Sequence, residues 1–207
     1  MRLLQCTGSV VLVALVAFVI PTASAETFTM ATFADPALSS ATPLFTLSGN
    51  QFTGGWSGFN LELLTPGLPA TPDIPDARFT MTPLTATVIT SEFYSLSGGE
   101  IKFFDGPTLV FDITFQSASL APDVGFGAST FSLQGVHFNA PLESAGFNAN
   151  LAFERFAFAF ANDVQPPLRD DSTWTASFTS SAAVPEPASA GLLLAGALIT
   201  SLRRRSA

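Results

Sequence analysis

Charged side chains are scarce in this sequence of 207 residues. Asp, Glu, Lys and Arg make up 12% of it, about half of the ~25% that is usual for a globular protein. Apolar residues make up 47%, and Phe alone occurs 21 times. A chain with so little charge and so many aromatic rings differs from a disordered segment, because it can bury enough apolar surface to offset the entropy lost on folding. We therefore expect one folded domain between the two chain ends.

Basic residues are the scarcer of the two charge signs, and the formal net charge is −8. The stretch 26–183 holds fifteen acidic side chains and four basic ones, a difference of −11. Its basic residues are Arg78, Lys102, Arg155 and Arg169. Binding to phosphate needs clustered Lys and Arg, so this composition argues against nucleic acid and anionic lipid as partners.

Long hydrophobic runs are also missing, since no run reaches the ~20 residues that span a bilayer easily. The N-terminal run, residues 10–20, follows Arg2 and precedes the small residues Ala23 and Ala25. A positive start, a short apolar core and a small-x-small site are the parts of a secretory signal peptide. We expect residues 1–25 to be such a peptide, cut by signal peptidase between Ala25 and Glu26.

Cysteine and histidine occur once each, as Cys6 and His137. Cys6 would leave with the signal peptide, so the mature chain would have neither a disulfide nor a thiolate metal site. A Ser-His-Asp triad would have to use His137, and a zinc site usually needs more than one His or Cys. No Gly-x-Ser-x-Gly sequence is present. We therefore expect no enzyme of these classes and no cofactor, and interpret His137 as a structural residue on a strand.

Residues 184–207 combine three features in a fixed order. They start with Val184, Pro185, Glu186 and Pro187, continue with an apolar stretch over 191–202, and then carry Arg203, Arg204 and Arg205. This combination resembles the PEP-CTERM sorting signal. The resemblance covers only these residues, and it implies processing by an exosortase, a membrane protease of Gram-negative bacteria that make exopolysaccharide.

The physical properties of this tail agree with such a role. The fifteen residues 188–202 would form about 22 Å of helix, short for a ~30 Å hydrocarbon core, although flanking residues and local thinning can cover the difference. The arginines should stay cytoplasmic under the positive-inside rule, which leaves the domain outside. The prolines keep the segment before the helix extended, in a form that a protease can bind. A plain tail anchor with a chance Pro-Glu-Pro is the alternative.

Residues 26–183 alternate with a period of two, which is typical of strands. Phe156, Phe158 and Phe160 alternate with alanines, and Trp174 is in phase with Phe178. Turn signals separate about nine such runs; they include Gly54-Gly55, Ser97-Gly98-Gly99-Glu100, Asp105-Gly106-Pro107 and Gly125-Phe126-Gly127. We expect a single all-β domain, an antiparallel β-sandwich or jelly roll. A parallel β-helix is the alternative, although no fixed repeat supports it.

Candidate ligand-binding residues are few. Trp56 follows Gly54-Gly55 and is the best candidate for an exposed aromatic residue that stacks on sugars, whereas we expect Trp174 in the core. Weak calcium candidates are Asp163, Asp170 and Asp171, with Asp73 and Asp76 in a second loop. Paired acids could serve a glycosidase; the strand acids Glu100, Asp112 and Glu154 are the least loop-like, but the alternation predicts that they face solvent.

These features together predict where the protein goes more clearly than what it binds. We expect an exported protein without enzymatic activity, anchored first in the inner membrane and then cut by exosortase. Its destination would be the cell surface or the extracellular matrix, with exopolysaccharide as a possible partner. A carbohydrate-binding module is the alternative, and a glycoside hydrolase ranks below both.

Overall fold

The computed structural model describes residues 26–36, 43–68, 73–140, 153–164 and 172–184. These residues form eleven β-strands and one short 3-10 turn, η1 (Thr130–Ser132). The strands are β1 (Glu26–Phe33), β2 (Phe45–Ser48), β3 (Gln51–Trp56), β4 (Arg78–Met81), β5 (Leu84–Thr90), β6 (Phe93–Asp105), β7 (Thr108–Ala121), β8 (Gly125–Ser129), β9 (His137–Asn139), β10 (Phe153–Val164) and β11 (Ser172–Val184). The expected all-β class is confirmed for these residues. They contain no helix with the length and hydrophobicity that a membrane span needs.

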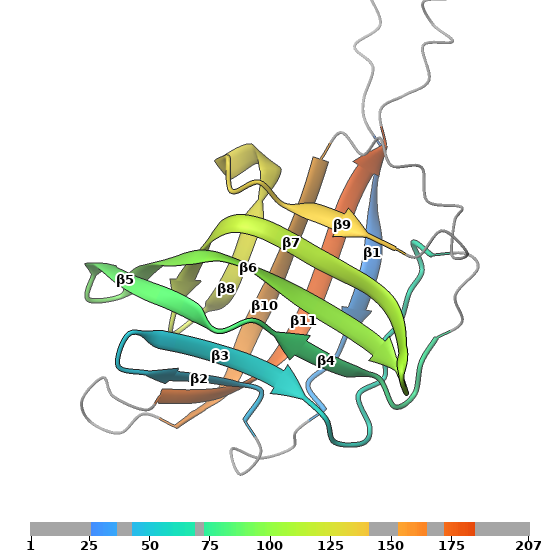
Figure 1. The fold of residues 1–207 in the computed structure, drawn as a ribbon, viewed down its shortest axis with the longest axis horizontal. Coiled ribbons are helices and arrows are strands. Elements are labelled where there is room, and N and C mark those ends of the chain that lie inside the picture. Colours follow the sequence, from blue (N-terminus) through green and yellow to red (C-terminus); the bar gives the residue numbers. More distant parts are fainter. Residues whose placement is uncertain (1–25, 37–42, 69–72, 141–152, 165–171, 185–207) are drawn as a thin grey trace, which may run out of the picture. The chain divides into compact units, whose positions relative to one another are not determined.

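The strands form one antiparallel sheet that closes on itself (Figure 1). Its circuit of eight positions runs β3–β2–β11–β10–β8–β7–β6–β4 and returns to β3. The prediction of a sandwich or jelly roll is therefore wrong, and the fold is a closed barrel. Alternation requires only that each strand has one buried face, and a barrel meets that requirement as well as two stacked sheets do.

The closure between β3 and β6 depends on two short strands placed end to end. β4 pairs with β3 at Gly55↔Thr80, β5 pairs with β3 at Phe52↔Leu84, and both strands pair with β6. Pro83 lies between β4 and β5. Because proline has no N–H to give to a ladder, it interrupts what would otherwise be one continuous strand.

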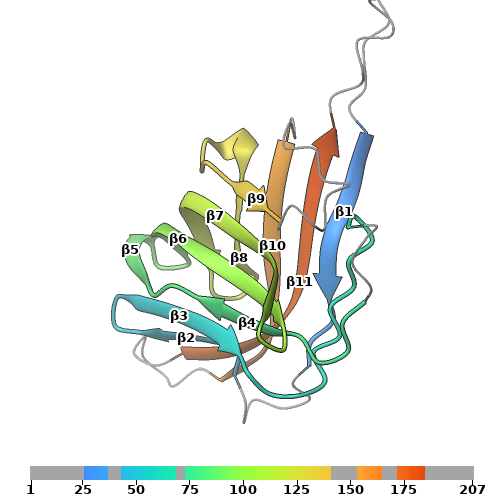
Figure 2. The same cartoon turned by 45° about the vertical axis from the view of Figure 1, so that its right-hand side comes forward.

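Two strands pair outside the circuit. β9 pairs with β7, and β1 pairs with β11 from Glu26↔Val184 to Phe33↔Phe178 (Figure 2). The first residue of β1 and the last residue of β11 are therefore direct partners on neighbouring strands.

Phenylalanine fills the barrel interior. Phe45, Phe52, Phe79, Phe103, Phe111, Phe126, Phe156, Phe158 and Phe178 are all buried, together with Trp174. Many of their rings touch: Phe126 and Phe158 are stacked with centroids 4.8 Å apart, and Phe103 and Phe111 with centroids 4.5 Å apart. The core position expected for Trp174 is confirmed.

Several glycines that signal turns in the sequence lie inside strands. Gly54 and Gly55 belong to β3, Gly98 and Gly99 to β6, and Gly125 and Gly127 to β8. The hairpin expected at residues 97–100 is therefore absent, and β6 continues through it to the Asp105–Gly106 turn. A Cβ atom on Gly98 would lie within 3.0 Å of the backbone oxygens of Phe115 and Gln116 on the neighbouring strand. Strand glycines here permit close approach of backbones rather than chain reversal.

Candidate functional site

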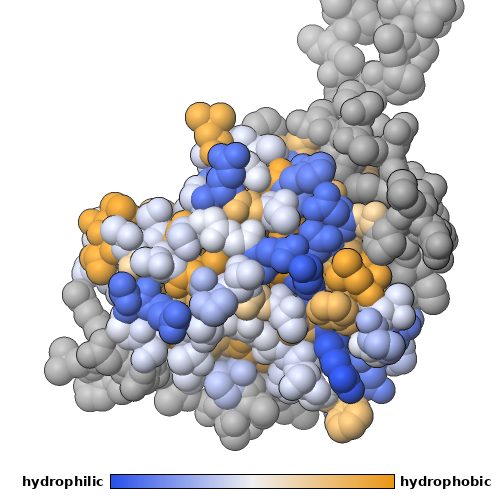
Figure 3. All heavy atoms as spheres, in the orientation of Figure 1, coloured by the Kyte–Doolittle hydropathy of each residue, from blue (hydrophilic) through white to orange (hydrophobic). Residues whose placement is uncertain are grey.

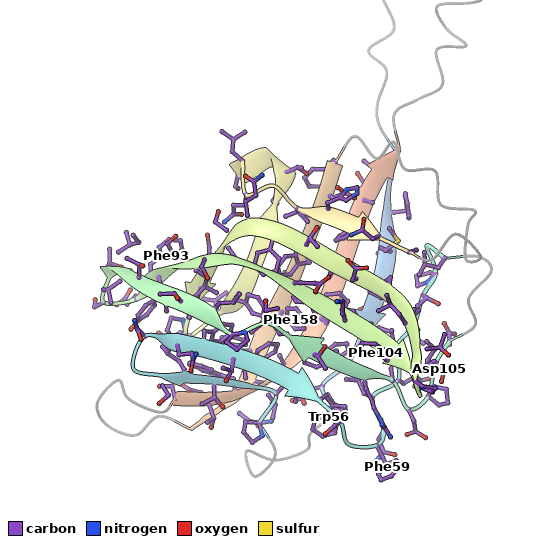
Figure 4. The ribbon with its side chains drawn as sticks, in the orientation of Figure 1. Trp56, Phe59, Phe93, Phe104, Asp105 and Phe158 are labelled. Carbon is purple, nitrogen blue, oxygen red and sulfur yellow. The ribbon has the colours of Figure 1, made fainter. Side chains whose placement is uncertain are left out.

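A depression with a volume of about 570 Å³ lies beside Trp56 on the barrel. It is lined by residues of β3 and β4, of the end of β6 and of the turns that follow β3 and β6: Gly54, Gly55, Trp56, Ser57, Arg78, Phe79, Thr80, Met81, Phe104 and Gly106. We call it the Trp56 pocket. Figure 4 shows Trp56, Phe104 and Asp105 on the same side of the barrel, where β3 ends and β6 turns into β7. A pocket of this volume accommodates a small organic ligand or a short oligosaccharide.

Trp56 is the last residue of β3 and only partly buried. It packs against the aromatic core, and its Nε1 is buried without a hydrogen-bond partner among the described residues. Since Nε1 is the only polar atom of the side chain, the exposed part of the indole is carbon. Trp56, expected as an exposed aromatic residue, is therefore half-buried, whereas Phe59 is 72% exposed.

Arg78 and Phe104 stand opposite each other on β4 and β6 and line the same pocket. Arg78 is exposed, and its flanking strand neighbours Ala77 and Phe79 are buried. Arg78 forms no ion pair with a carboxylate of the described residues. The ion pairs among those residues are Lys102–Glu100 and His137–Glu154. The pocket therefore combines the Phe104 ring, two hydroxyl residues and a guanidinium that forms no ion pair with the described residues. Sequence reasoning missed Arg78 and Phe104, which lie 26 residues apart and are joined only by strand pairing.

Two aspartates fix the chain that follows Trp56. Asp76 accepts a hydrogen bond from the backbone N–H of Asn60 at 2.9 Å, and Asp73 accepts one from that of Thr65 at 3.2 Å. Asn60 has a φ of 66°, a conformation that Asn tolerates better than most residues. Asp73 and Asp76 were calcium candidates in the sequence, and in the structure they fix the backbone of the chain after β3 by these hydrogen bonds.

The primary calcium candidates are not brought together in the described part of the chain. Asp163 lies in β10 and is exposed, whereas Asp170 and Asp171 lie outside the described residues. Among the residues that the structure describes, no three His, Cys, Asp or Glu side chains gather in a way that could hold a metal ion.

A second polar cluster surrounds β9. The Glu154 side chain is 6% exposed, and its Oε1 accepts the backbone N–H of Phe138 at 2.9 Å. Its Oε2 lies 3.3 Å from Nδ1 of His137, whose side chain is 53% exposed. No backbone ladder joins β9 to β10 among the described residues, so this carboxylate bridges the two strands. His137 lies on a strand as expected and contributes to this bridge.

Asp112 and Glu154 correct the expectation that strand acids face solvent. Asp112 is buried and accepts a hydrogen bond from Asn139 Nδ2 at 2.8 Å, on the opposite side of β9 from Glu154. Glu100 is half-exposed and pairs with Lys102 at 2.8 Å, and this hydrogen bond raises the pKa of Lys102 above its ordinary value. Figure 3 shows hydrophilic residues gathered over the area where Figure 1 draws β6, β7 and β9. The two buried acids, Asp112 and Glu154, therefore hold β9 by hydrogen bonds to Asn139 and Phe138.

We predict that Glu154→Gln lowers the free energy of unfolding by about 1–3 kcal/mol, because a buried charged acceptor is replaced by an amide whose NH₂ group faces His137. Urea denaturation of the purified protein measures this loss. Glu62→Gln, at an exposed position, is the matched control and should change stability by about 0.5 kcal/mol or less. Equal stability of the two variants would contradict the bridging role.

Most residues of the predicted sorting signals lie outside the described residues. Ala23 and Ala25 precede the described chain, and Pro185, Glu186, Pro187 and Arg203–Arg205 follow it. Only Glu26 and Val184 fall within it, as the first residue of β1 and the last of β11. The start of β1 and the end of β11 thus lie next to the two predicted cleavage regions.

The lining residues of the Trp56 pocket indicate which kind of ligand it can bind. Its aromatic carbon, hydroxyls and guanidinium suit binding of a polar ligand with an apolar face, and the carboxylates around β9 are engaged in structural hydrogen bonds. Comparison of the chain with protein-family models, with curated proteins and with solved structures finds no significant match.

Proposed function

We propose that this protein is exported, held in the inner membrane by its C-terminal segment, and cut by an exosortase to become a surface or matrix protein. In this proposal the barrel has no enzymatic role. Signal peptidase and exosortase are its processing partners, and exopolysaccharide is the material in which it resides.

The observation that carries the proposal is the pairing of Glu26 with Val184. The expected signal-peptidase cut lies just before Glu26, and the Pro-Glu-Pro segment starts just after Val184. Both cuts would therefore fall outside the strand pairing and leave every described strand intact. A domain whose two ends lie together in the sheet can lose both terminal segments without losing core residues.

Mass spectrometry of the protein from a strain with an active exosortase tests this proposal. We expect a chain that starts at Glu26 and lacks the apolar stretch 191–202 together with Arg203–Arg205. In the same strain without the exosortase, or with Pro185, Glu186 and Pro187 replaced by Ala, the tail should remain. An intact C-terminus in the exosortase-positive strain would overturn the proposal.

A second candidate function, carbohydrate binding, is favoured by the Trp56 pocket. Sugar rings present an apolar C–H face and a polar rim, and the pocket offers the Phe104 ring together with the polar side chains of Ser57, Arg78 and Thr80. Glycoside hydrolysis ranks lower, because buried Asp112 and Glu154 already bind Asn139 and the N–H of Phe138.

A further inference from the structure

We propose that the barrel forms a symmetric dimer through an apolar groove beside Phe93, and that the partner in this groove is a second copy of the chain. Arg155 of each copy would then lie next to Glu92 of the other. The inference concerns the outer surface of β7, β8 and β10, and it does not depend on export, on processing or on carbohydrate binding.

Two neighbouring turns of the barrel carry exposed apolar side chains. Val88 and Ile89, near the end of β5, are 56% and 58% exposed. Phe93, at the start of β6, is 39% exposed, and Val124, in the β7–β8 turn, is 69% exposed. Phe93 and Val124 line the same depression, so the two turns lie side by side, and Figure 4 shows Phe93 far from Trp56. Apolar surface that gathers in this way marks an interaction site, whereas single exposed apolar residues do not.

The depression, which we call the Phe93 groove, has a volume of about 250 Å³. Strand pairing places Gly127 between a serine of β7 and an alanine of β10, and Gly125 between alanines of the same two strands. Apart from Phe93 and Val124, its lining consists of small uncharged residues and two buried rings: Ser119, Ala121, Gly125, Gly127, Ala157, Ala159, Phe126 and Phe158. Large apolar side chains and a hollow of small residues therefore lie next to each other on one surface.

Opposite charges lie at the two ends of the Phe93 groove. Arg155 and Ala159 are both exposed and share the outward face of β10, about 13 Å apart at 3.3 Å per residue. Glu92 is exposed and directly precedes Phe93, and strand pairing through Ala121 sets this end of β6 level with Ala159. Neither Arg155 nor Glu92 belongs to an ion pair formed among the described residues.

This arrangement is self-complementary, which favours a second copy over an unrelated partner. In a two-fold interface, a residue of one copy that contacts a given residue of the other is contacted by it in the same way on the opposite side. With the axis across the Phe93 groove, Phe93 and Val124 of each copy meet small residues of the other. The same axis brings Arg155 of each copy to Glu92 of the other, whereas an apolar ligand such as an acyl chain would use neither charge.

Sedimentation velocity of the purified full-length chain, over a range of concentrations, tests the proposal. We expect a monomer–dimer equilibrium in which Phe93→Ser weakens the dimer by about tenfold or more, as is usual for an aromatic residue at the centre of an interface. Phe59→Ser is the matched control, because it removes a more exposed ring from the chain after β3 and should leave the dimer unchanged.

Charge reversal tests which residues face each other. Arg155→Glu or Glu92→Arg should each weaken the dimer by about tenfold or more, because like charges then meet across the interface. The double variant should recover the dimer, and so should an equimolar mixture of the two single variants, since each copy then supplies the charge that the other needs. Arg78→Glu is the matched control, because Arg78 is also exposed and lies on β4, four positions from β10 in the circuit of strands. Association through the apolar terminal segments would not follow this pattern.

Unchanged circular dichroism of each variant establishes that it is folded. A chain that stays monomeric up to its solubility limit would overturn the proposal, and so would a dimer that every variant leaves intact. Failure of the double variant to recover the dimer would overturn the pairing of Arg155 with Glu92. If the monomer instead binds vesicles of phosphatidylcholine, and Phe93→Ser abolishes that binding, the groove takes a lipid surface and the proposed dimer is wrong.

Discussion

Phe158→Ala is expected to lower the free energy of unfolding by about 3–5 kcal/mol, the usual cost of removing a buried phenylalanine ring. Phe158 is 1% exposed and lies at the centre of the aromatic core (Figure 4). Its ring contacts those of Phe126 and Phe178, with centroids 4.8 and 4.7 Å away. These rings come from β8 and β11, so the cavity would loosen contacts on both sides of β10.

Urea denaturation followed by circular dichroism measures this loss. Phe158→Leu should fall between the wild type and the alanine variant, because it leaves a smaller cavity. Phe59→Ala removes the same ring at an exposed position and should change stability by about 0.5 kcal/mol or less. Similar stabilities for the variants at positions 158 and 59 would contradict the position assigned to Phe158.

Gly125→Ala is expected to destabilise the barrel by about 3 kcal/mol or more, because it combines backbone strain with overpacking. Gly125 has a φ of 149°, which residues with a Cβ rarely adopt. A Cβ there would overlap the carbonyl oxygen of Phe158 on the neighbouring strand, where Gly125 pairs with Ala159. The added methyl group would push β8 away from β10 at the core.

Gly106→Ala separates the two contributions. Gly106 also has a positive φ, 54°, but nothing lies within 4 Å of a Cβ built on it. Its substitution should cost only the backbone strain, about 1–2 kcal/mol. Thermal denaturation of both variants measures the difference, and a loss for Gly125→Ala no larger than that for Gly106→Ala would contradict the close contact of β8 with β10.

At Gly98-Gly99 and at Glu154, the local sequence pattern predicts a different environment from the one that the structure shows. Gly98-Gly99 has the composition of a turn, yet β6 continues through it because β7 approaches closely there. Glu154 has the alternation of a solvent-facing residue, yet it is buried because β9 needs an acceptor for the N–H of Phe138. In each case the deciding neighbour lies 16 or more residues away in the chain.

The sequence by itself determined the all-β class, the core position of Trp174 in phase with Phe178, and the two terminal segments as candidate sorting signals, since these follow from local period, hydrophobic length and residue type. The tertiary structure decided that the sheet closes into a barrel, that Glu26 pairs with Val184, and that Arg78 and Phe104 share a pocket with Trp56. The reason is physical: alternation fixes which face of a strand is buried, whereas the choice of partner strand depends on contacts between distant residues.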